Sequence, residues 1–374
     1  MSKAYKAMKL RLYPTETQKE YFLKNIGCCR FVYNHYLDKR KTIYEDTGES
    51  YSRFDCSKDL TEFKKENEFL QEVDSTALNW SLLHLDAAFK NFFRDKSVGY
   101  PKFKSRYSPN QSFTVSKVKV DRNCVILPKI GKILARGHRE FNNATYKAGT
   151  ITLAPSGKFY ISIRVEYETD IPVVEVNEDK VIGLSFKSDS LYIDSNGHSA
   201  CMPKYYKDLS DKLAREQEKL SRMVPDSNNY KKQKIKVARV HEHIANQRND
   251  FIHKLTAELA ETYDLICVED VSISKMIQNI EYKNARKSIL DNGWNGFITT
   301  LQYKLEERGK QLIKVKSETP ISHICSECGA VIAADTKLKD KWTCSECNTE
   351  HVKGKNTAIN IKSAGYKQYL EANS

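Results

Sequence analysis

The chain has 374 residues, of which 40% are hydrophobic, a size that favours two to four structural units over one small core. Lysine and arginine number 61 against 48 acidic residues, and the resulting net charge of +13 favours a polyanion as partner. No run of 18 apolar residues exists, and the N-terminal "MSKAYKAMKLRLYP" lacks the apolar core of a signal peptide. These features exclude membrane and secreted classes, so we expect a soluble intracellular protein.

The N-terminal stretch predicts one strand followed by a helical region. Residues 3–13 alternate as a strand does, and Pro14 ends them. Thr15 with Gln18 three positions later forms a capping box, which marks the start of a helix. Helical periodicity then continues to about residue 97.

Residues 100–167 change to short alternating segments separated by prolines and glycines. Within them, residues 149–168 have the pattern of a hairpin. We predict a small β-barrel that the helical region interrupts in sequence, with strand 3–13 joining that barrel.

The second half of the chain predicts alternating strands and helices after a linker at 167–179. The elements expected in order are a hairpin at 180–197, an antiparallel helix pair at 205–262 split at Pro225, a buried strand at 263–271, a helix at 291–308, a strand at 310–315 and a C-terminal helix. This order is typical of an α/β unit.

Positive charge concentrates between Lys96 and Lys158. This stretch holds 13 lysine and arginine residues against Asp121 and Glu140, a local net charge of +11. Such a run is often only a solvated surface. Here its density and the interleaved aromatic residues favour a nucleic-acid contact.

Four cysteines near the C-terminus form two CxxC pairs separated by fifteen residues. They are Cys325, Cys328, Cys344 and Cys347, which we call the four-cysteine cluster. Thiolates at this spacing surround Zn²⁺ tetrahedrally, and Gly329 and Asn348 suit the tight turn that follows each pair. Because all four positions are protein ligands, we predict structural zinc rather than free thiols. His323 and His351 flank the cluster and are not needed as ligands.

Glu269 ends the apolar strand "YDLICVEDV". A carboxylate at that place is a usual ligand in two-metal phosphodiester cleavage, which needs a group of acids. Alone, Glu269 is equally well a surface residue at a strand end. Asp250 with His253 suggests hydrolase chemistry only weakly, since a helical Asp-x-x-His is usually a capping or packing pair.

Several stretches together resemble the TnpB family, the RNA-guided nucleases of bacterial insertion sequences and relatives of type V CRISPR effectors. They are "LRLYPTETQKEYFLKNIGCCRFVYN", "LDAAFKNFF", "YPKFKSR", "NQRNDFIHKL", "ICVEDVSISKM", "WNGFITTLQYKLEERG", "CSECG" with "WTCSEC", and "NTAINI". The resemblance implies a multidomain α/β protein with a wedge β-barrel, a helical recognition lobe, and a ribonuclease-H-like RuvC domain with a zinc-ribbon insertion. The implied boundaries are 1–14 and 99–172 for the barrel, 15–98 for the lobe, 173–320 and 350–374 for the RuvC-like domain, and 321–349 for the zinc-binding insertion.

Active members of the family resemble one another in three metal-binding acids, and two are missing here. The first aspartate falls on Gly183 in "VIGLS", the glutamate is present as Glu269, and the last aspartate falls on Gly354 in "GKNTAINI". We call these three positions the vestigial site. One carboxylate would hold Mg²⁺ only weakly, so we expect a degenerate nuclease with no catalytic residues.

Other acids are poorly placed to substitute. Asp189 and Asp194 lie in the hairpin turn and its second strand, where facing the side of Gly183 would need a change of register. Glu350 lies beside a zinc ligand, and Glu371 lies seventeen residues past Gly354.

The resemblance also implies partners. Guide RNA and a double-stranded DNA target next to a short motif are expected, with one protein per guide RNA, no membrane, and a location in the bacterial cytoplasm at the nucleoid. Lys102, Lys104 and Arg106 are predicted to contact phosphates, and Ser75, Thr76 and Asn79 lie where the family reads the short motif.

The function expected from these features is RNA-guided DNA binding without cleavage, which represses transcription as the nuclease-dead TnpB-like repressors of transposon origin do. The alternatives are an active TnpB endonuclease that uses a non-standard acid, and a decayed transposon product without a function.

Overall fold

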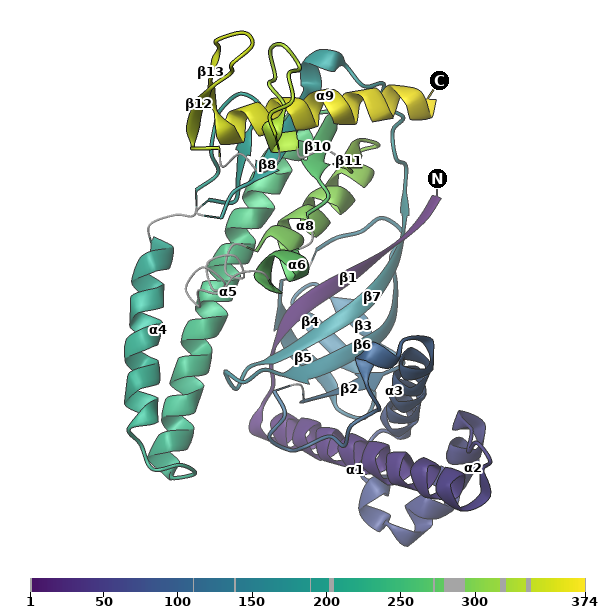
Figure 1. Cartoon of the computed structure of the whole chain (residues 1–374). Helices are drawn as coiled ribbons and strands as arrows, with labels where there is room; N and C mark the ends of the chain where they lie inside the picture. Colours follow the sequence, from purple (N-terminus) through teal and green to yellow (C-terminus); the bar gives the residue numbers. More distant parts are fainter. Residues whose placement is uncertain are drawn as a thin grey trace. The chain divides into compact units, whose positions relative to one another are not determined.

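The computed structural model describes residues 2–109, 111–137, 139–188, 190–201, 205–271, 273–278, 293–316, 321–333 and 338–373. The chain divides into two compact units, Met1–Asp170 and Ile171–Ser374. Each unit has its own sheet, and both are drawn in Figure 1.

Unit 1 combines one seven-stranded sheet with three α-helices. Its strands are β1 (Ser2–Tyr13), β2 (Gln111–Val115), β3 (Lys119–Asp121), β4 (Cys124–Leu127), β5 (Gly131–Arg136), β6 (Thr145–Leu153) and β7 (Phe159–Thr169). The strand order is β2-β6-β7-β1-β5-β4-β3. β1 pairs antiparallel with β7 along its whole length and with β5 at its end. The N-terminal strand therefore joins the later ones, as the sequence predicts.

The sheet of unit 1 is barrel-like. Its two edge strands, β2 and β3, are joined by residues 116–118 alone. Because three residues reach only about 10 Å, the sheet must curl until its edges come close together. No β2–β3 pairing closes the ladder among the strands described here.

The first inserted helix of unit 1 begins at the cap that the sequence predicts. The inserted helices are α1 (Glu16–Thr47), α2 (Arg53–Glu66) and α3 (Ser75–Arg94), with short 3-10 helices at Glu68–Gln71 and Lys96–Val98. Thr15 and Gln18 form the capping box of α1, and Asp74 caps α3. Leu78, Leu82 and their helical neighbours share one hydrophobic core with the sheet.

Unit 2 is built on a four-stranded sheet of ribonuclease-H-like arrangement. Its strands are β8 (Val181–Phe186), β9 (Tyr192–Asp194), β10 (Leu265–Glu269) and β11 (Gln311–Val315), in the order β11-β10-β8-β9. β10 is parallel to β8 and β11, whereas β9 is antiparallel to β8. A bridge from Ile193 to Ser199 marks the return of the chain beside β9.

Helices cover both faces of this sheet. They are α4 (Tyr205–Ser221), α5 (Asn228–Thr262), α6 (Ile273–Gln278), α8 (Trp294–Glu306) and α9 (Lys353–Asn373), with 3-10 helices at Glu178–Lys180 and Ile321–His323. Ile182, Ile266 and Val268 pack with α5 and α8, whereas Val181 and Cys267 pack with Ile361 of α9. The α4–α5 pair splits around Pro225 as predicted, and α9 crosses the sheet in Figure 1.

A small hairpin of β12 (Lys341–Thr343) and β13 (Glu350–Val352) precedes α9 and carries half of the four-cysteine cluster. Within the ranges given above, no helix is both long and apolar enough to cross a membrane.

Candidate functional site

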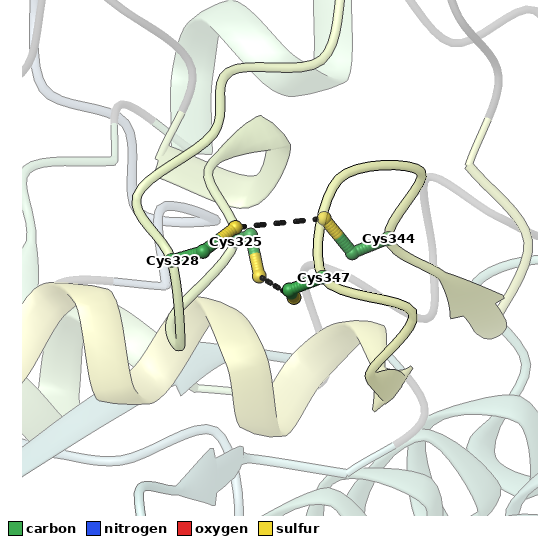
Figure 2. A group of neighbouring side chains, drawn as sticks. All are labelled: Cys325, Cys328, Cys344 and Cys347. Atoms are coloured by element: carbon green, nitrogen blue, oxygen red, sulfur yellow. Dashed lines mark hydrogen bonds between the residues drawn. The ribbon is translucent and has the colours of Figure 1, made fainter.

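The four-cysteine cluster is assembled in a geometry that suits zinc (Figure 2). The sulfur atoms all lie within 4.8 Å of one another. The Sγ atoms of Cys325 and Cys347 are 3.6 Å apart, and those of Cys328 and Cys344 are 3.7 Å apart. Zn–S bonds of about 2.3 Å in a tetrahedron require S–S separations of about 3.8 Å. The donors therefore fit Zn²⁺, and zinc binding stays a prediction.

Local backbone geometry positions each cysteine pair. Gly329 and Asn348 have positive φ angles of 74° and 57°. Their N–H groups donate to the carbonyl oxygens of Cys325 and Cys344, each at 3.0 Å. The predicted turn residues therefore close the tight turn of each CxxC pair. We call the turn at Cys325–Cys328 the first knuckle and the turn at Cys344–Cys347 the second.

Two residues next to the four-cysteine cluster contact its sulfur atoms. The Nε2 atom of buried His351 lies 3.1 Å from Sγ of Cys325, and its ring packs on Trp342. Hydrogen bonds with Thr349 lower the pKa of the Cys347 thiol to about 6. A lowered pKa favours the thiolate that a metal needs. That the four cysteines are the ligands and His351 is not needed as one stays a prediction.

Helix α9 holds the first knuckle through two asparagines. Buried Asn356 accepts from the backbone N–H of Ser326 at 2.9 Å and donates to the carbonyl oxygen of Ile324 at 2.7 Å. Asn360 also donates to the carbonyl of Ile324, at 2.7 Å. The motif "NTAIN" therefore fixes the cluster to the start of α9.

The same helix lies on the sheet face that carries Gly183 and Glu269. Register pairs Gly183 of β8 with Cys267 of β10, and strand pleating puts Glu269 on the face of Cys267. Standard strand spacing places the Cα atoms of Gly183 and Glu269 about 8 Å apart. That the three vestigial positions lie within reach of one metal stays a prediction.

No room exists for a carboxylate at position 183. A Cβ atom on Gly183 would overlap the carbonyl oxygen of Ala358 and lie 2.7 Å from the backbone nitrogen of Lys362. Both obstacles are backbone atoms of α9, so a side-chain rotation cannot relieve them. An aspartate here requires α9 to move away from the sheet.

Close packing continues along α9 on both sides of Gly183. A Cβ atom on Gly354 would lie 2.6 Å from the side chain of Ile193, and one on Gly365 would overlap Sγ of Cys267. Burial raises the pKa of the Cys267 thiol to about 12. This cysteine is therefore a packing residue between sheet and helix.

Of the three vestigial positions, position 269 carries a carboxylate, and burial raises the pKa of Glu269. In the described ranges, the four-cysteine cluster is the one group of three or more potential metal ligands, and Glu269 is not part of it.

The other acids of the sequence analysis are used elsewhere or lie apart. Asp194 pairs with Leu184 in the ladder, so it faces away from α9, and its carboxylate accepts from the N–H groups of Asn196 and His198. Glu350 is exposed on β13, and Glu371 contacts Lys367. Asp189 falls outside the described residues.

Asp250 and His253 each contact a neighbouring side chain. Asp250 pairs with Lys254 at 2.8 Å, and His253 lies 3.4 Å from the hydroxyl of Tyr303. That the two residues belong to the scaffold stays a prediction.

The predicted phosphate contacts lie on an exposed segment of unit 1. Lys102, Lys104 and Arg106 are exposed. Asn34 fixes the backbone of Lys104 by two hydrogen bonds. Although Lys104 is exposed as a whole residue, its ammonium group lies 4.0 Å from the centroid of the buried Tyr33 ring, and this partial burial lowers its pKa. Phosphate contact by these residues stays a prediction.

The predicted motif-reading residues lie on the first turns of α3 and are exposed. Thr76 donates its hydroxyl to Asp74, and the side chain of Asn79 contacts both Ser57 and the carbonyl of Ser75. These contacts orient the exposed face of α3, and base contact by Ser75, Thr76 and Asn79 stays a prediction.

Three family models match the chain. One described as "Probable transposase" (OrfB of IS605) matches residues 162–279, one described as "Helix-turn-helix domain" matches residues 1–49, and one described as "Cas12f1-like, TNB domain" matches residues 294–361. In this chain, the region matched by the second model forms strand β1 followed by helix α1. The third model spans the four-cysteine cluster.

The fold and the four-cysteine cluster define a ribonuclease-H-like protein with a cysteine-rich ribbon. A protein of Streptomyces pristinaespiralis named "Putative RNA-guided DNA endonuclease" is 32% identical over 98% of this chain and 90% of its own length. "Putative RNA-guided DNA endonuclease InsQ" of Escherichia coli (strain K12) is 33% identical over 97% of this chain and 93% of its own length. The chain therefore belongs to the TnpB family of IS605-type elements, as its motifs indicate.

A solved structure supports the fold. The chain titled "Cryo-EM structure of the Cas12f1-sgRNA-target DNA complex" superposes with a TM-score of 0.56 at 11% identity, and the match covers 96% of this chain and 99% of that chain. The predicted combination of a barrel-like unit, an inserted helical lobe, and a ribonuclease-H-like unit with a ribbon is therefore correct.

Two structural roles were missed from the sequence. Asn356 and Asn360 anchor the cysteine-rich ribbon to α9. Gly365 has no side chain, so Cys267 can pack directly against α9. The spacing of Asn356 and Asn360, four residues apart on one helix face, was the available indication.

Proposed function

We propose that this member of the TnpB family is an RNA-guided DNA-binding protein that does not cut DNA and that represses transcription at its target. Two of the three family acids are glycines, and the backbone of α9 lies where the side chain of the first acid would be. That packing carries the proposal, because two-metal cleavage requires several carboxylates in an open cluster.

The nucleic-acid part of the proposal is supported by charge and by relatives. The relatives named above are called "Putative RNA-guided DNA endonuclease". Residues 96–158 of unit 1, which we call the basic segment, carry a local net charge of +11. Guide RNA would supply target recognition by base pairing, while protein residues hold backbones. A protein that opens its target and leaves it intact obstructs polymerase.

A cofactor and a stoichiometry are part of the same proposal. Zinc in the four-cysteine cluster would have a structural role, because no open coordination position remains among four protein ligands. We propose one protein per guide RNA.

The decisive experiment tests binding and cleavage together. RNA that co-purifies with the protein is sequenced to define the guide, and matched duplex DNA is then incubated with the complex in Mg²⁺ or Mn²⁺. We expect a guide-dependent footprint on uncut DNA, and Glu269→Ala should change the binding affinity less than about twofold. Glu350→Ala, at an exposed acid of the same unit, is the matched control.

Guide-dependent cutting by the unmodified protein, abolished by Glu269→Ala, would show an active endonuclease instead. An additional acid outside the described residues, such as Glu281 or Asp291, would then be the candidate to complete the site. Absence of an enriched RNA and of target binding would indicate a decayed transposon product.

The basic segment gives a second test of the proposal. Replacing Lys102, Lys104 and Arg106 together by alanine should weaken binding and lower the slope of log K against log salt by about two to three. A promoter reporter with the guide-matched target should lose repression in parallel. An unchanged salt slope would place the phosphate contacts elsewhere.

A further inference from the structure

Unit 1 contains a groove that no step above uses. It lies between the second half of α1, the loop after it, the end of α3 and the segment that leads to Tyr100, and its volume is about 580 Å³. This is within the range of about 300–1,000 Å³ typical of ligand pockets. Six aromatic residues line it, namely Tyr44, Tyr51, Phe89, Phe92, Phe93 and Tyr100. We call it the aromatic groove.

Three of the six rings of the aromatic groove are exposed. Phe93 is 67% exposed, Tyr44 is 63% exposed and Tyr100 is 43% exposed. Phe92 packs against two of these rings, at 5.4 Å from Phe93 and 5.5 Å from Tyr100. Grouped exposed aromatics on a folded surface mark a binding site.

Cations accompany these rings, and Glu45, the acid of the lining, is paired with Lys41 at 3.7 Å. The ammonium group of Lys96 lies 4.0 Å from the centroid of Phe92 and 5.0 Å from that of Phe93, and the guanidinium of Arg40 lies 4.4 Å from Phe89. Arg40 is paired with Asp86 at 3.6 Å. Among the residues that the structure describes, Lys96 forms no ion pair, so its charge is available to an anionic ligand.

The basic segment continues directly from the groove with the same alternation. Phe103 is 58% exposed and Tyr107 is 77% exposed, and Arg106 lies 5.6 Å from the centroid of the Tyr107 ring. An apolar peptide would need no such row of cations. Alternating rings and positive charges match a ligand that alternates flat bases with phosphates.

We propose that the aromatic groove binds unpaired nucleobases of single-stranded RNA by stacking on Phe93, Tyr44 and Tyr100, with Lys96 beside a phosphate. The inference rests on the RNA-binding part of the proposed function and is independent of the loss of cleavage. Exposed rings suit bases of any sequence, because every base has an aromatic face.

The test uses the full-length protein freed of co-purified RNA and an oligoadenylate RNA of about 15 nucleotides, with an RNA duplex of the same length for comparison. The double variant Phe93→Ala and Tyr44→Ala should bind the single strand about tenfold more weakly and the duplex unchanged, whereas Phe93→Trp should retain binding. Both replaced side chains are exposed, so the fold should survive, and thermal unfolding checks this.

Two further measurements locate the contact. Ultraviolet cross-links from the oligoadenylate should map to residues 89–100, and Lys96→Ala should lower the salt slope by about 0.7. Tyr5→Ala is the matched control, because Tyr5 is 54% exposed and Arg164 lies 4.4 Å from its ring on the sheet of the same unit.

Equal binding of the single strand by the double variant and the unmodified protein would overturn the proposal, as would cross-links that lie only elsewhere. Self-association of the unmodified protein that the double variant loses would instead make the groove an interface between copies. If the groove variants lose nothing while guided DNA binding persists, only this inference fails. If the unmodified protein binds no RNA, both proposals fail.

Discussion

The four-cysteine cluster and the vestigial site lie against the same helix, α9, yet they differ in every respect that metal binding requires. The cluster keeps four donor sulfurs within 4.8 Å of one another. The vestigial site keeps one carboxylate, Glu269, while α9 packs directly on Gly183. A structural metal stabilises the fold and remains useful whether or not the protein cuts DNA. Catalytic acids stabilise nothing by themselves, since grouped carboxylates repel one another.

The contrast also explains how α9 serves both regions. Asn356 and Asn360 face the first knuckle, whereas Ala358 and Gly365 face the sheet. With glycine at position 183, the backbone of α9 packs directly against β8. We infer that closure of the vestigial site now contributes to stability.

The largest effect is expected from removing a zinc ligand. Cys325→Ser or Cys344→Ser should abolish zinc binding and destabilise unit 2 by on the order of 5 kcal/mol, because the free energy of metal binding is also free energy of folding. Metal analysis and calorimetric unfolding measure both effects. Cys201→Ser, at an exposed cysteine outside the cluster, is the control. If the wild-type protein contains no zinc and unfolds at the same temperature as the two variants, the proposed difference in metal binding between the two regions is wrong.

Restoring the first family acid should be the next most damaging change. Gly183→Asp should lower the free energy of unfolding by about 3 kcal/mol or more, since it forces α9 outward and buries an unpaired charge. Gly183→Ala tests the steric part alone and should cost about 1–3 kcal/mol.

Gly296→Ala is the matched control for both, because no atom lies within 4 Å of a Cβ at that exposed helical position. It should be neutral or stabilising by up to about 1 kcal/mol. A stable Gly183→Asp protein, alone or with Gly354→Asp, that binds Mn²⁺ would show that the site is still open.

Asn356→Ala tests the connection between the two regions. The backbone N–H of Ser326 would lose its partner and the carbonyl oxygen of Ile324 would keep Asn360 alone, and the expected cost is about 1–2 kcal/mol. Hydrogen exchange at residues 324–326 should rise while zinc stays bound. Asn373→Ala at the exposed end of α9 should have no such effect, and equal exchange in both variants would contradict the anchoring role.

The smallest effect is expected at Glu269, and its sign depends on pH. Burial raises the pKa of this carboxyl above its value in the unfolded chain, so its ionisation opposes folding as pH rises through the folded pKa. Glu269→Gln should therefore be slightly more stable than wild type at pH 7 to 8, by no more than about 1 kcal/mol, and equal to it near pH 4.

Denaturant titrations at the two pH values measure this difference, and they should be insensitive to Mg²⁺ or Mn²⁺. Stabilisation of the wild type but not of Glu269→Gln by either ion would reveal additional carboxylates and a functional metal site.

Much of the fold was predictable because its determinants are local. The capping box at Thr15 and Gln18, the hairpin at 149–168 and the break at Pro225 each depend on neighbouring residues, and all are confirmed. The joining of β1 to β7 depended on a general rule, that a strand left unpaired must find a sheet.

The candidate sites divide in the same way. The spacing of four cysteines specified their cluster, because short CxxC turns fix the sulfur positions locally. The absence of the two other family acids beside Glu269 could be seen in the sequence, because glycine occupies both positions. The roles of Asn356, Gly365 and Cys267 could not be predicted, since each depends on a contact between distant segments.

The sequence by itself determined which side chains are available: four thiolates, one remaining family carboxylate, and a dense run of positive charge with aromatic residues. The tertiary structure alone decided how closely α9 approaches Gly183, and that residues 40–51 and 89–100 together form the aromatic groove. The physical reason is the separation in sequence between the residues that determine each feature. Turn, cap and ligand spacings are set by a few consecutive residues, whereas the distance between packed elements results from all the side chains between them.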